Sequence, residues 1–435
     1  MTLIDLGELT EPTEPAPPRR RGPARNRRLW AALVALAALL TVAGAAPPAA
    51  RVHATVPAGL GADVLLSADQ IFIVTPAPGV TDGTRELVAY PRPGHATVRP
   101  QRLAPLWRVS LPAGSSVFQA EPVDDFGVLF SISHQSSTLD VLETWLLDSR
   151  TGQQRWRAPG AATLDGAGRV LLRTFIVGEP TILKAVDLAD GREVWSTSLL
   201  AVWMDHHQRD GVIDAIVVAT SAGDVEVLEP ETGKPRHRLP PFNDDPGGYL
   251  QASVVGDLVV VVRNSRTVTA YDLDGLTQRW QTAVPLADYV TPCGVLICAQ
   301  VASGGAHFLD SATGALRWTS PDTVNVVVAD GVRALAVAST GGDALDVIAV
   351  DAATGATLTE YGTWSPVFEY EYTQRLLGTR VVPDIGLLLA RLDPAEPRPR
   401  HIDVLAGAVR ECQHRGDLVA CRRQDGDIGV WRLPD

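Results

Sequence analysis

The stretch FLDSATGALRW, from Phe308 to Trp318, recurs along the chain with other letters but with the same spacing. An acidic residue is followed four residues later by a glycine and eight residues later by a bulky or polar side chain. The copies are Asp148, Gly152, Trp156; Asp187, Gly191, Trp195; Glu229, Gly233, His237; Asp310, Gly314, Trp318; and Asp351, Gly355, Thr359. A related copy has Asp272, Gly275 and Trp280, with its glycine one residue early.

These copies follow one another at a nearly constant interval. The steps from Asp148 to Asp351, acid to acid, are 39, 42, 43, 38 and 41 residues. A period of about 40 residues is typical of propellers and repeat arrays. The chain is therefore predicted to be a repeat protein.

The motif has a local physical explanation. Apolar residues before the acid, such as Ile348-Ala349-Val350, indicate the end of a strand. The acid can accept backbone N–H groups and start a turn, and the glycine can take a positive φ and close a hairpin with a bulge. The tryptophan then begins the returning strand, where it can be buried against a neighbouring sheet. We therefore interpret these acids as turn formers rather than as metal ligands or catalysts.

The coarse pattern predicts an all-β protein. Within one period, Val324–Val328, Leu335–Val337, Asp346–Val350 and Ala356–Tyr361 are expected to be four short strands separated by turns. Four strands in about 40 residues are typical of a β-propeller blade. Residues 62–435 would give eight four-stranded blades, with seven as the alternative, and the last strand could complete the first blade.

The N-terminal part has a different composition. Residues 1–28 are rich in Pro, Glu and Arg and are expected to be a disordered cytoplasmic tail. Leu29–Ala46 is an uncharged apolar run of 18 residues, long enough to cross a bilayer as a helix, and six arginines precede it. The positive-inside rule places the remainder outside the cytoplasm, after a linker over residues 47–61. The alternative is a secretory signal cleaved after Ala43-Gly44-Ala45.

Charge excludes one class of partner. The net charge is −12, and only Lys184 and Lys234 are lysines, a bias that fits a GC-rich bacterial genome. An acidic chain of this kind is not expected to bind nucleic acid.

The strand, the Asp-x-x-Thr-Gly turn and the tryptophan together resemble the repeat of pyrroloquinoline-quinone-type propellers. This family includes quinoprotein dehydrogenases and BamB-like scaffolds. The clear motifs cover Asp148 to Thr359, and weaker copies extend toward both ends of the propeller region. The resemblance implies the fold; it does not imply the cofactor.

No cofactor or metal is expected. Quinoprotein dehydrogenases of this family carry two sequence-adjacent cysteines over the quinone, whereas Cys293, Cys298, Cys412 and Cys421 are not adjacent. Instead, a short turn separates Cys293 from Cys298 and Cys412 from Cys421. The residues on either side of each turn are expected to form two antiparallel strands. We therefore predict the disulfides Cys293–Cys298 and Cys412–Cys421, formed outside the cytoplasm, with four buried thiols as the alternative.

Other candidate residues have weaker support. His206-His207 is the one pair of adjacent histidines, but neighbours on a strand point to opposite faces and could not readily share an ion. Glu369-Tyr370-Glu371-Tyr372 could be a strand or the acidic and aromatic rim of a binding surface. Asp124-Asp125 and Asp244-Asp245 could bind calcium but more commonly would be solvated loop acids.

These observations favour a noncatalytic, membrane-anchored, extracytoplasmic propeller. It would be a monomer that binds a protein or peptide partner on one face, with Leu29–Ala46 in the membrane. The alternatives are a quinone-dependent dehydrogenase and a sensor or carbohydrate-binding propeller for an envelope ligand. The sequence does not indicate which face binds.

Overall fold

The computed structural model describes residues 51–433, apart from residues 124–125, 137–138, 176–178, 242–247, 330, 340–343 and 368–375. The chain divides into two compact units, Met1–Ala50 and Arg51–Asp435, and the described residues all belong to the second. No helix among them has the length and hydropathy that crossing a bilayer requires. The predicted tail and the predicted membrane segment Leu29–Ala46 lie outside the described residues.

The described residues form β-strands joined by turns, which group into four-stranded blades. Blade 1 contains β2 (Asp63–Leu66), β3 (Gln70–Pro76), β4 (Arg85–Pro91) and β6 (Trp107–Leu111); blade 2 contains β7 (Ser116–Val123), β8 (Gly127–Ser136), β9 (Leu139–Leu147) and β10 (Gln154–Pro159); blade 3 contains β11 (Ala161–Leu164), β12 (Arg169–Thr174), β13 (Thr181–Asp187) and β14 (Glu193–Leu199). Blade 4 contains β15 (Ala201–Arg209), β16 (Val212–Thr220), β17 (Val225–Leu228) and β18 (Pro235–Leu239); blade 5 contains β19 (Leu250–Val255), β20 (Leu258–Arg263), β21 (Thr267–Asp272) and β22 (Gln278–Ala283); blade 6 contains β23 (Ala287–Cys293), β24 (Leu296–Val301), β25 (Ala306–Asp310) and β26 (Leu316–Ser320).

In the remaining blades, one strand is shared between two blades and another comes from the opposite end of the propeller sequence. Blade 7 contains β27 (Thr323–Ala329), β28 (Arg333–Ser339), β29 (Leu345–Asp351) and the first part of β30 (Thr357–Val367); blade 8 contains the end of β30 with β31 (Leu376–Val382), β32 (Gly386–Leu392) and β33 (Arg400–Ala406). Blade 9 contains β34 (Ala408–Arg415), β35 (Leu418–Arg423), β36 (Ile428–Arg432) and β1 (His53–Val56), and β5 (Gln101–Arg102) is added to its edge. The four strands predicted over residues 324–361 are confirmed as β27 to β30.

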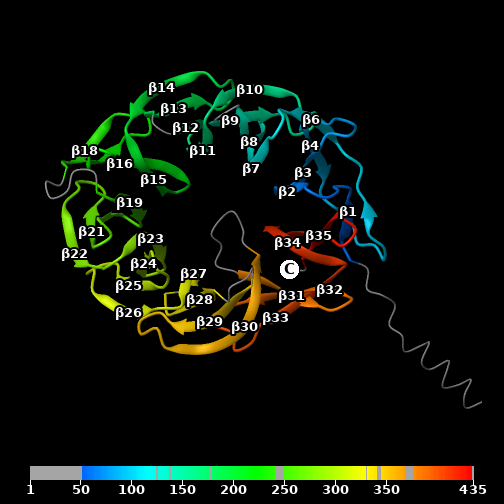
Figure 1. The fold of residues 1–435 in the computed structure, drawn as a ribbon. Helices are drawn as coiled ribbons and strands as arrows, with labels where there is room; N and C mark the ends of the chain where they lie inside the picture. The colour runs from blue at the N-terminus through cyan, green and yellow to red at the C-terminus, as the bar shows by residue number, and fades with distance from the viewer. Residues whose placement is uncertain are drawn as a thin grey trace, which may run out of the picture. The chain divides into compact units, whose positions relative to one another are not determined.

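The number of blades differs from the prediction. The described strands form eight hydrogen-bonded sheets, and the seven-stranded one contains two blades that share β30, which gives nine blades. Nine apolar clusters join each blade to the next and blade 9 to blade 1, so the blades close into a ring (Figure 1). The prediction of eight blades, or seven, is not confirmed. A period of about 40 residues over residues 62–435 corresponds to nine blades rather than eight, although blades 8 and 9 lack the full motif.

Successive blades are joined by the motif tryptophans. Each indole lies against the motif glycine of the following blade, and its N–H donates to the carbonyl of the residue after the motif acid. These bonds are Trp107 to Ser149 (2.8 Å), Trp156 to Leu188 (2.9 Å), Trp195 to Pro230 (2.9 Å), Trp280 to Ser311 (2.9 Å) and Trp318 to Ala352 (3.1 Å). The five glycines have φ between 67° and 71°, and a Cβ on any of them would lie 2.3–2.8 Å from the indole.

At the junction of blades 4 and 5, the tryptophan position and the turn that it packs against both differ from the motif. In blade 4 the position of the motif tryptophan is occupied by His237, so no indole lies against the turn of blade 5. In that turn Leu276, rather than Gly275, has the positive φ of 51°, and its N–H donates to the Asp272 carbonyl. Our assignment of Gly275 as the turn glycine was therefore wrong by one residue. Leu276 is buried in the cluster between blades 4 and 5, where it fills space that an indole takes elsewhere.

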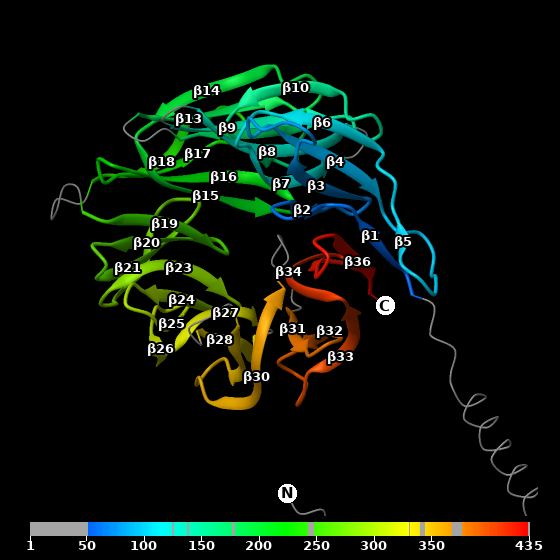
Figure 2. The same ribbon diagram turned by 45° about the vertical axis from the view of Figure 1, so that its right-hand side comes forward.

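The ring is closed by the first strand. β1 pairs antiparallel with β36, from His53 opposite Trp431 to Val56 opposite Ile428. Part of the segment expected as a linker, residues 47–61, is thus a strand, and the first strand completes the last blade rather than the reverse. The insertion between Tyr90 and Trp107 supplies β5, which runs parallel to β1 and covers its outer edge (Figure 2).

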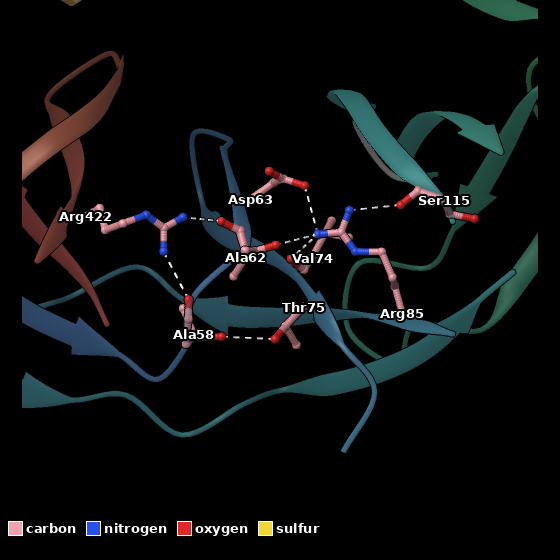
Figure 3. Close-up of polar contacts among 10 residues, drawn as sticks. Ala58, Ala62, Asp63, Val74, Thr75, Arg85, Ser115 and Arg422 are labelled. Carbon is pink, nitrogen blue, oxygen red and sulfur yellow. Dashed lines mark hydrogen bonds and ion pairs between the residues drawn. The ribbon is translucent and has the colours of Figure 1, made fainter. Parts of the chain in front are cut away.

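Two arginines hold the loop that leads from β1 to β2 (Figure 3). Arg85 donates to the Gly61 and Val74 carbonyls, both at 3.0 Å, and to the Asp63 carboxylate at 2.9 Å. From blade 9, Arg422 donates to the Gly59 carbonyl at 3.0 Å and to the Ala62 carbonyl. Because Arg422 is buried, these bonds satisfy its N–H donors, and the Glu411 carboxylate pairs with its charge, which would be costly to leave unpaired.

Both predicted disulfides are confirmed. Cys293–Cys298 joins β23 to β24, and Cys412–Cys421 joins β34 to β35. Each links the first two strands of its blade. No cysteine among the described residues is free.

We expect Gly191→Ala to destabilise the protein more than Gly168→Ala. Both glycines have positive φ, at 71° and 85°, so each substitution should cost about 1–2 kcal/mol of backbone strain. Only at Gly191 would the new Cβ lie 2.8 Å from the Trp156 ring, which adds about 1–3 kcal/mol of overpacking. Urea unfolding followed by far-ultraviolet circular dichroism measures both, and equal losses would show that the indole does not depend on the glycine.

Removal of either disulfide should lower the free energy of unfolding by about 2 kcal/mol, because each closes only a short loop. The paired variants Cys293→Ala/Cys298→Ala and Cys412→Ala/Cys421→Ala test this by chemical unfolding. The parent protein should take up no alkylating agent until it is reduced and unfolded. Alkylation of four cysteines in the unreduced protein would contradict the pairing.

Stability should fall between about pH 4 and pH 2. Hydrogen bonds from Arg317 and Thr313 lower the pKa of Asp310 to about 2, and those from Arg155 and Thr151 do the same for Asp148. A lowered folded-state pKa contributes stability above the unfolded value and loses it as the pH falls through the folded value.

The variant Asp148→Asn/Asp310→Asn should therefore show a shallower loss of stability across this pH interval. Asp322→Asn changes an exposed carboxylate with no side-chain bond among the described residues, and it should follow the parent curve. Thermal unfolding from pH 2 to pH 6 measures these curves. A double variant as acid-sensitive as the parent would contradict the role given to the two turns.

Candidate functional site

The predicted turn residues are distributed around the ring. Each motif acid lies at the tip of its own hairpin, where Asp310, for example, accepts the N–H of Thr313 at 2.9 Å and its hydroxyl at 2.7 Å. The structure does not bring these acids together. Within the described ranges, no three Asp, Glu, His or Cys side chains are grouped as a metal site would require.

The two adjacent histidines face different surroundings, as their places on β15 predict. His207 is buried, with its Nδ1 against Asp214 and its Nε2 3.5 Å from Asp257 of blade 5. His206 lies 3.2 Å from the Gln208 amide, and burial lowers the pKa of its imidazole. His207 therefore connects two blades, and the pair does not share a ligand.

Three other candidate stretches lie outside the described residues: Asp124-Asp125, Asp244-Asp245 and Glu369–Tyr372. The Pro-rich segment from Asp393 to Arg400 has a structural contact. Its Asp393 and Glu396 carbonyls accept the Tyr361 hydroxyl at 2.7 and 2.5 Å, where other blades accept an indole.

The two faces of the ring differ in exposed apolar surface. On the turn face, the first strand of each blade joins the second and the third joins the fourth. On the crossover face, the second strand joins the third and the chain passes to the next blade. All the large aromatic side chains described as exposed lie toward the crossover face: Phe118, Phe175, Trp203, Tyr249 and Tyr289. Apolar surface gathered on one face is typical of an interaction site.

A groove runs along the crossover face from blade 2 to blade 5. It consists of three adjoining cavities of about 340, 550 and 730 Å³. The first two share Arg173 and Met204, and the second and third share Val202 and Trp203. The beginning of β15 thus forms the middle of the groove.

A bulge explains why two consecutive residues of β15 are exposed there. The pairing with β16 shifts register between Ala201 and Trp203, so Val202 has no opposite residue. Bulges commonly re-aim side chains near functional sites. With Phe175 and Leu200, these residues form what we call the apolar strip (Phe175, Leu200, Val202 and Trp203), each between 38% and 58% exposed.

Trp203 differs from the motif tryptophans. Its indole is 38% exposed, whereas the motif indole of Trp156 is 7% exposed. The Trp156 N–H donates to a neighbouring blade, while the Trp203 N–H has no acceptor among the residues that the structure describes. The Trp203 indole N–H is therefore available to donate a hydrogen bond to a partner.

Sequence reasoning did not identify the apolar strip. The repeat period predicts only the acid, glycine and tryptophan positions, and all of these lie on the turn face. One signal was present: Trp203 lies outside the eighth position after any motif acid and follows Val202 in a strand that should alternate. The residue types of this strand do not indicate the bulge that exposes both residues.

The fold resembles solved structures of low sequence identity. BamB from Moraxella catarrhalis is 15% identical with a TM-score of 0.41, over 73% of this chain and 98% of that chain. Sqt1 of Saccharomyces cerevisiae is 11% identical with a TM-score of 0.47, over 89% and 96%. The computationally designed Ika8 protein is 14% identical with a TM-score of 0.45, over 73% and 96%.

Sequence comparison gives two results. No curated protein matches the chain. The family model described as outer membrane protein assembly factor BamB matches residues 94–247 and 180–360, two overlapping ranges that together cover more than half of the chain.

Proposed function

Because the chain belongs to the BamB family of β-propeller repeat proteins, we propose that it is a noncatalytic protein-interaction scaffold that binds its partner through the apolar strip. The observation that carries the proposal is the gathering of exposed aromatic and aliphatic side chains on the crossover face. Aromatic residues in a well-formed groove are the usual anchors of protein interfaces.

The second cavity of the groove fits an apolar anchor from a protein. Its volume is about 550 Å³, and its lining includes Leu142, Phe175, Val202 and Met204. Burying these side chains under a partner would remove apolar surface from water, at about 25 cal/mol for each Å². Arg173, an exposed lining residue, has a guanidinium that could orient the bound segment.

The proposed location is outside the cytoplasm, with the propeller held to the membrane through Leu29–Ala46 as a monomer. The two disulfides support an oxidising compartment, since such bonds are rare in the cytosol. The arginines before the apolar run support a cytoplasmic N-terminus.

A noncatalytic role is part of the proposal. All four cysteines are engaged in disulfides within their own blades, so none is available for the adjacent-cysteine arrangement of the quinone enzymes. The motif acids are likewise engaged in their turns, as Asp310 and Asp351 are with the threonines three residues later.

Site-specific photo-crosslinking in intact cells tests the binding face. Val202→p-benzoylphenylalanine places the reactive group on the apolar strip, and Val295→p-benzoylphenylalanine is the matched control on the turn face. The two valines are 51% and 55% exposed, so a difference between them reports location rather than accessibility. We expect position 202, and not position 295, to give a covalent adduct with one defined protein.

Leu200→Asp in the same chain should abolish the adduct, because a carboxylate would have to be desolvated in the interface. The far-ultraviolet circular dichroism spectrum should not change, since Leu200 is exposed. Equal adducts at positions 202 and 295, or an adduct that survives Leu200→Asp, would contradict binding through the apolar strip.

A further inference from the structure

The largest of the three cavities, between blades 4 and 5, has a different character from the apolar strip. Its volume of about 730 Å³ lies in the range of small-ligand sites. Aromatic rings, planar amides, hydroxyls and arginines line it together: Trp203, Tyr249, Asn264, Arg266 and Gln281 are the residues on which the argument rests.

Two aromatic rings form its apolar surfaces. Trp203 and Tyr249 are 38% and 41% exposed. The Tyr249 hydroxyl donates to the Asp288 carbonyl of blade 6 at 2.5 Å, which fixes the ring and leaves its face as the surface offered to a ligand. The C–H faces of a pyranose ring stack on such aromatic faces, whereas its hydroxyls require polar partners at the edge.

The polar partners are held in place by a hairpin turn. Asn264 and Ser265, between β20 and β21, have positive φ values of 49° and 51°, which is the geometry of a type I′ turn. The Asn264 N–H donates to the Tyr249 carbonyl at 2.8 Å, and the Arg266 N–H donates to the Arg263 carbonyl at 2.9 Å. These two bonds fix the backbone from which the Asn264 and Arg266 side chains extend.

The space for the Asn264 side chain depends on Gly248. A Cβ at position 248 would lie 2.0 Å from the Asn264 Oδ1. The amide therefore lies directly over the backbone of the segment that carries Tyr249. An amide can donate to one hydroxyl and accept from its neighbour, which matches the vicinal hydroxyls of a sugar.

The charge of the cavity is opposite to that of the chain. The net charge of the protein is −12, yet Arg263 and Arg266 line this cavity and none of its described lining residues is acidic. Arg263 donates to the Tyr271 hydroxyl. Arg266 is exposed, and the described residues record no ion pair for it, so its guanidinium can bind a carboxylate in a bidentate manner.

We propose that this cavity binds an acidic saccharide, with pyranose rings on Trp203 and Tyr249, hydroxyls on Asn264 and Gln281, and a sugar carboxylate on Arg266. The combination of aromatic faces with planar polar side chains favours a saccharide over an acidic peptide. Trp203 also belongs to the apolar strip, so a saccharide and a protein partner would compete for its indole.

Isothermal titration calorimetry on the full-length protein in detergent tests the proposal. The probes are a tetrasaccharide of alternating glucuronic acid and N-acetylglucosamine, the neutral N-acetylglucosamine tetrasaccharide, and a tetraglutamate peptide. We expect the acidic tetrasaccharide to bind, and the neutral one to bind about tenfold more weakly because it lacks the charge-assisted contact. We expect no binding of the peptide.

Variants assign the binding to the cavity. Arg266→Gln should weaken the acidic tetrasaccharide about tenfold while leaving the neutral one unchanged. Arg279→Gln removes the same charge from an exposed position on β22 that does not line the cavity, and it should bind like the parent. Gln281→Ala, an exposed position, should weaken both sugars and remains informative if Arg266→Gln fails to fold.

Several results would overturn the proposal: no binding of either sugar, equal binding of the two sugars, unchanged affinity in Arg266→Gln, or binding of the peptide in place of the sugar. Leu200→Asp should not alter the saccharide affinity, because Leu200 does not line this cavity. Because Val202 and Trp203 line both sites, the two proposals are separated by Leu200→Asp, which changes the apolar strip alone, and by Arg266→Gln, which changes this cavity alone.

Discussion

Contact between a tryptophan of one blade and the hairpin turn of the next is the constraint on which the other features depend. The indole needs a flat surface and a carbonyl acceptor, which the Asp-x-x-Thr-Gly turn provides because its glycine lacks a Cβ. Trp280 against Gly314 shows the arrangement, with the N–H on the Ser311 carbonyl at 2.9 Å. The same contact recurs at five of the nine junctions between described blades, so one local motif fixes how many of the neighbouring blades pack.

This constraint leaves the opposite face free for function. The turn face is occupied by hairpins whose side chains serve the contacts between blades. The loops of the crossover face do not make these contacts between blades, and they vary in length and composition. The bulge at Val202 and the type I′ turn at Asn264 both lie there. The apolar strip and the cavity beside it share Trp203, so the two proposed ligands would compete for one indole on this face.

The sequence predicted the parts of the fold that are local. Asp310, Gly314 and Trp318 are enough to predict a hairpin and its buried ring, and Cys293 and Cys298 are close enough for their pairing to follow from the turn between them. Features that depend on long-range pairing were not predicted. The strand at His53–Val56 has no strong pattern, and its partner Ile428–Arg432 lies at the other end of the chain. The groove was missed because it arises from four blades and from a register shift that the residue types do not reveal.

The closing strand also has a consequence for biosynthesis. β1 is among the first segments of the propeller to be made, and its antiparallel partner β36 is among the last, so β1 has only β5 to pair with until almost the whole chain has been synthesised. An unpaired edge is a hazard for aggregation during that delay. A chain truncated before Ile428 could not pair β1 with β36, so its ring would stay open. Only a chain that includes the final strand can therefore cover this edge of its first strand.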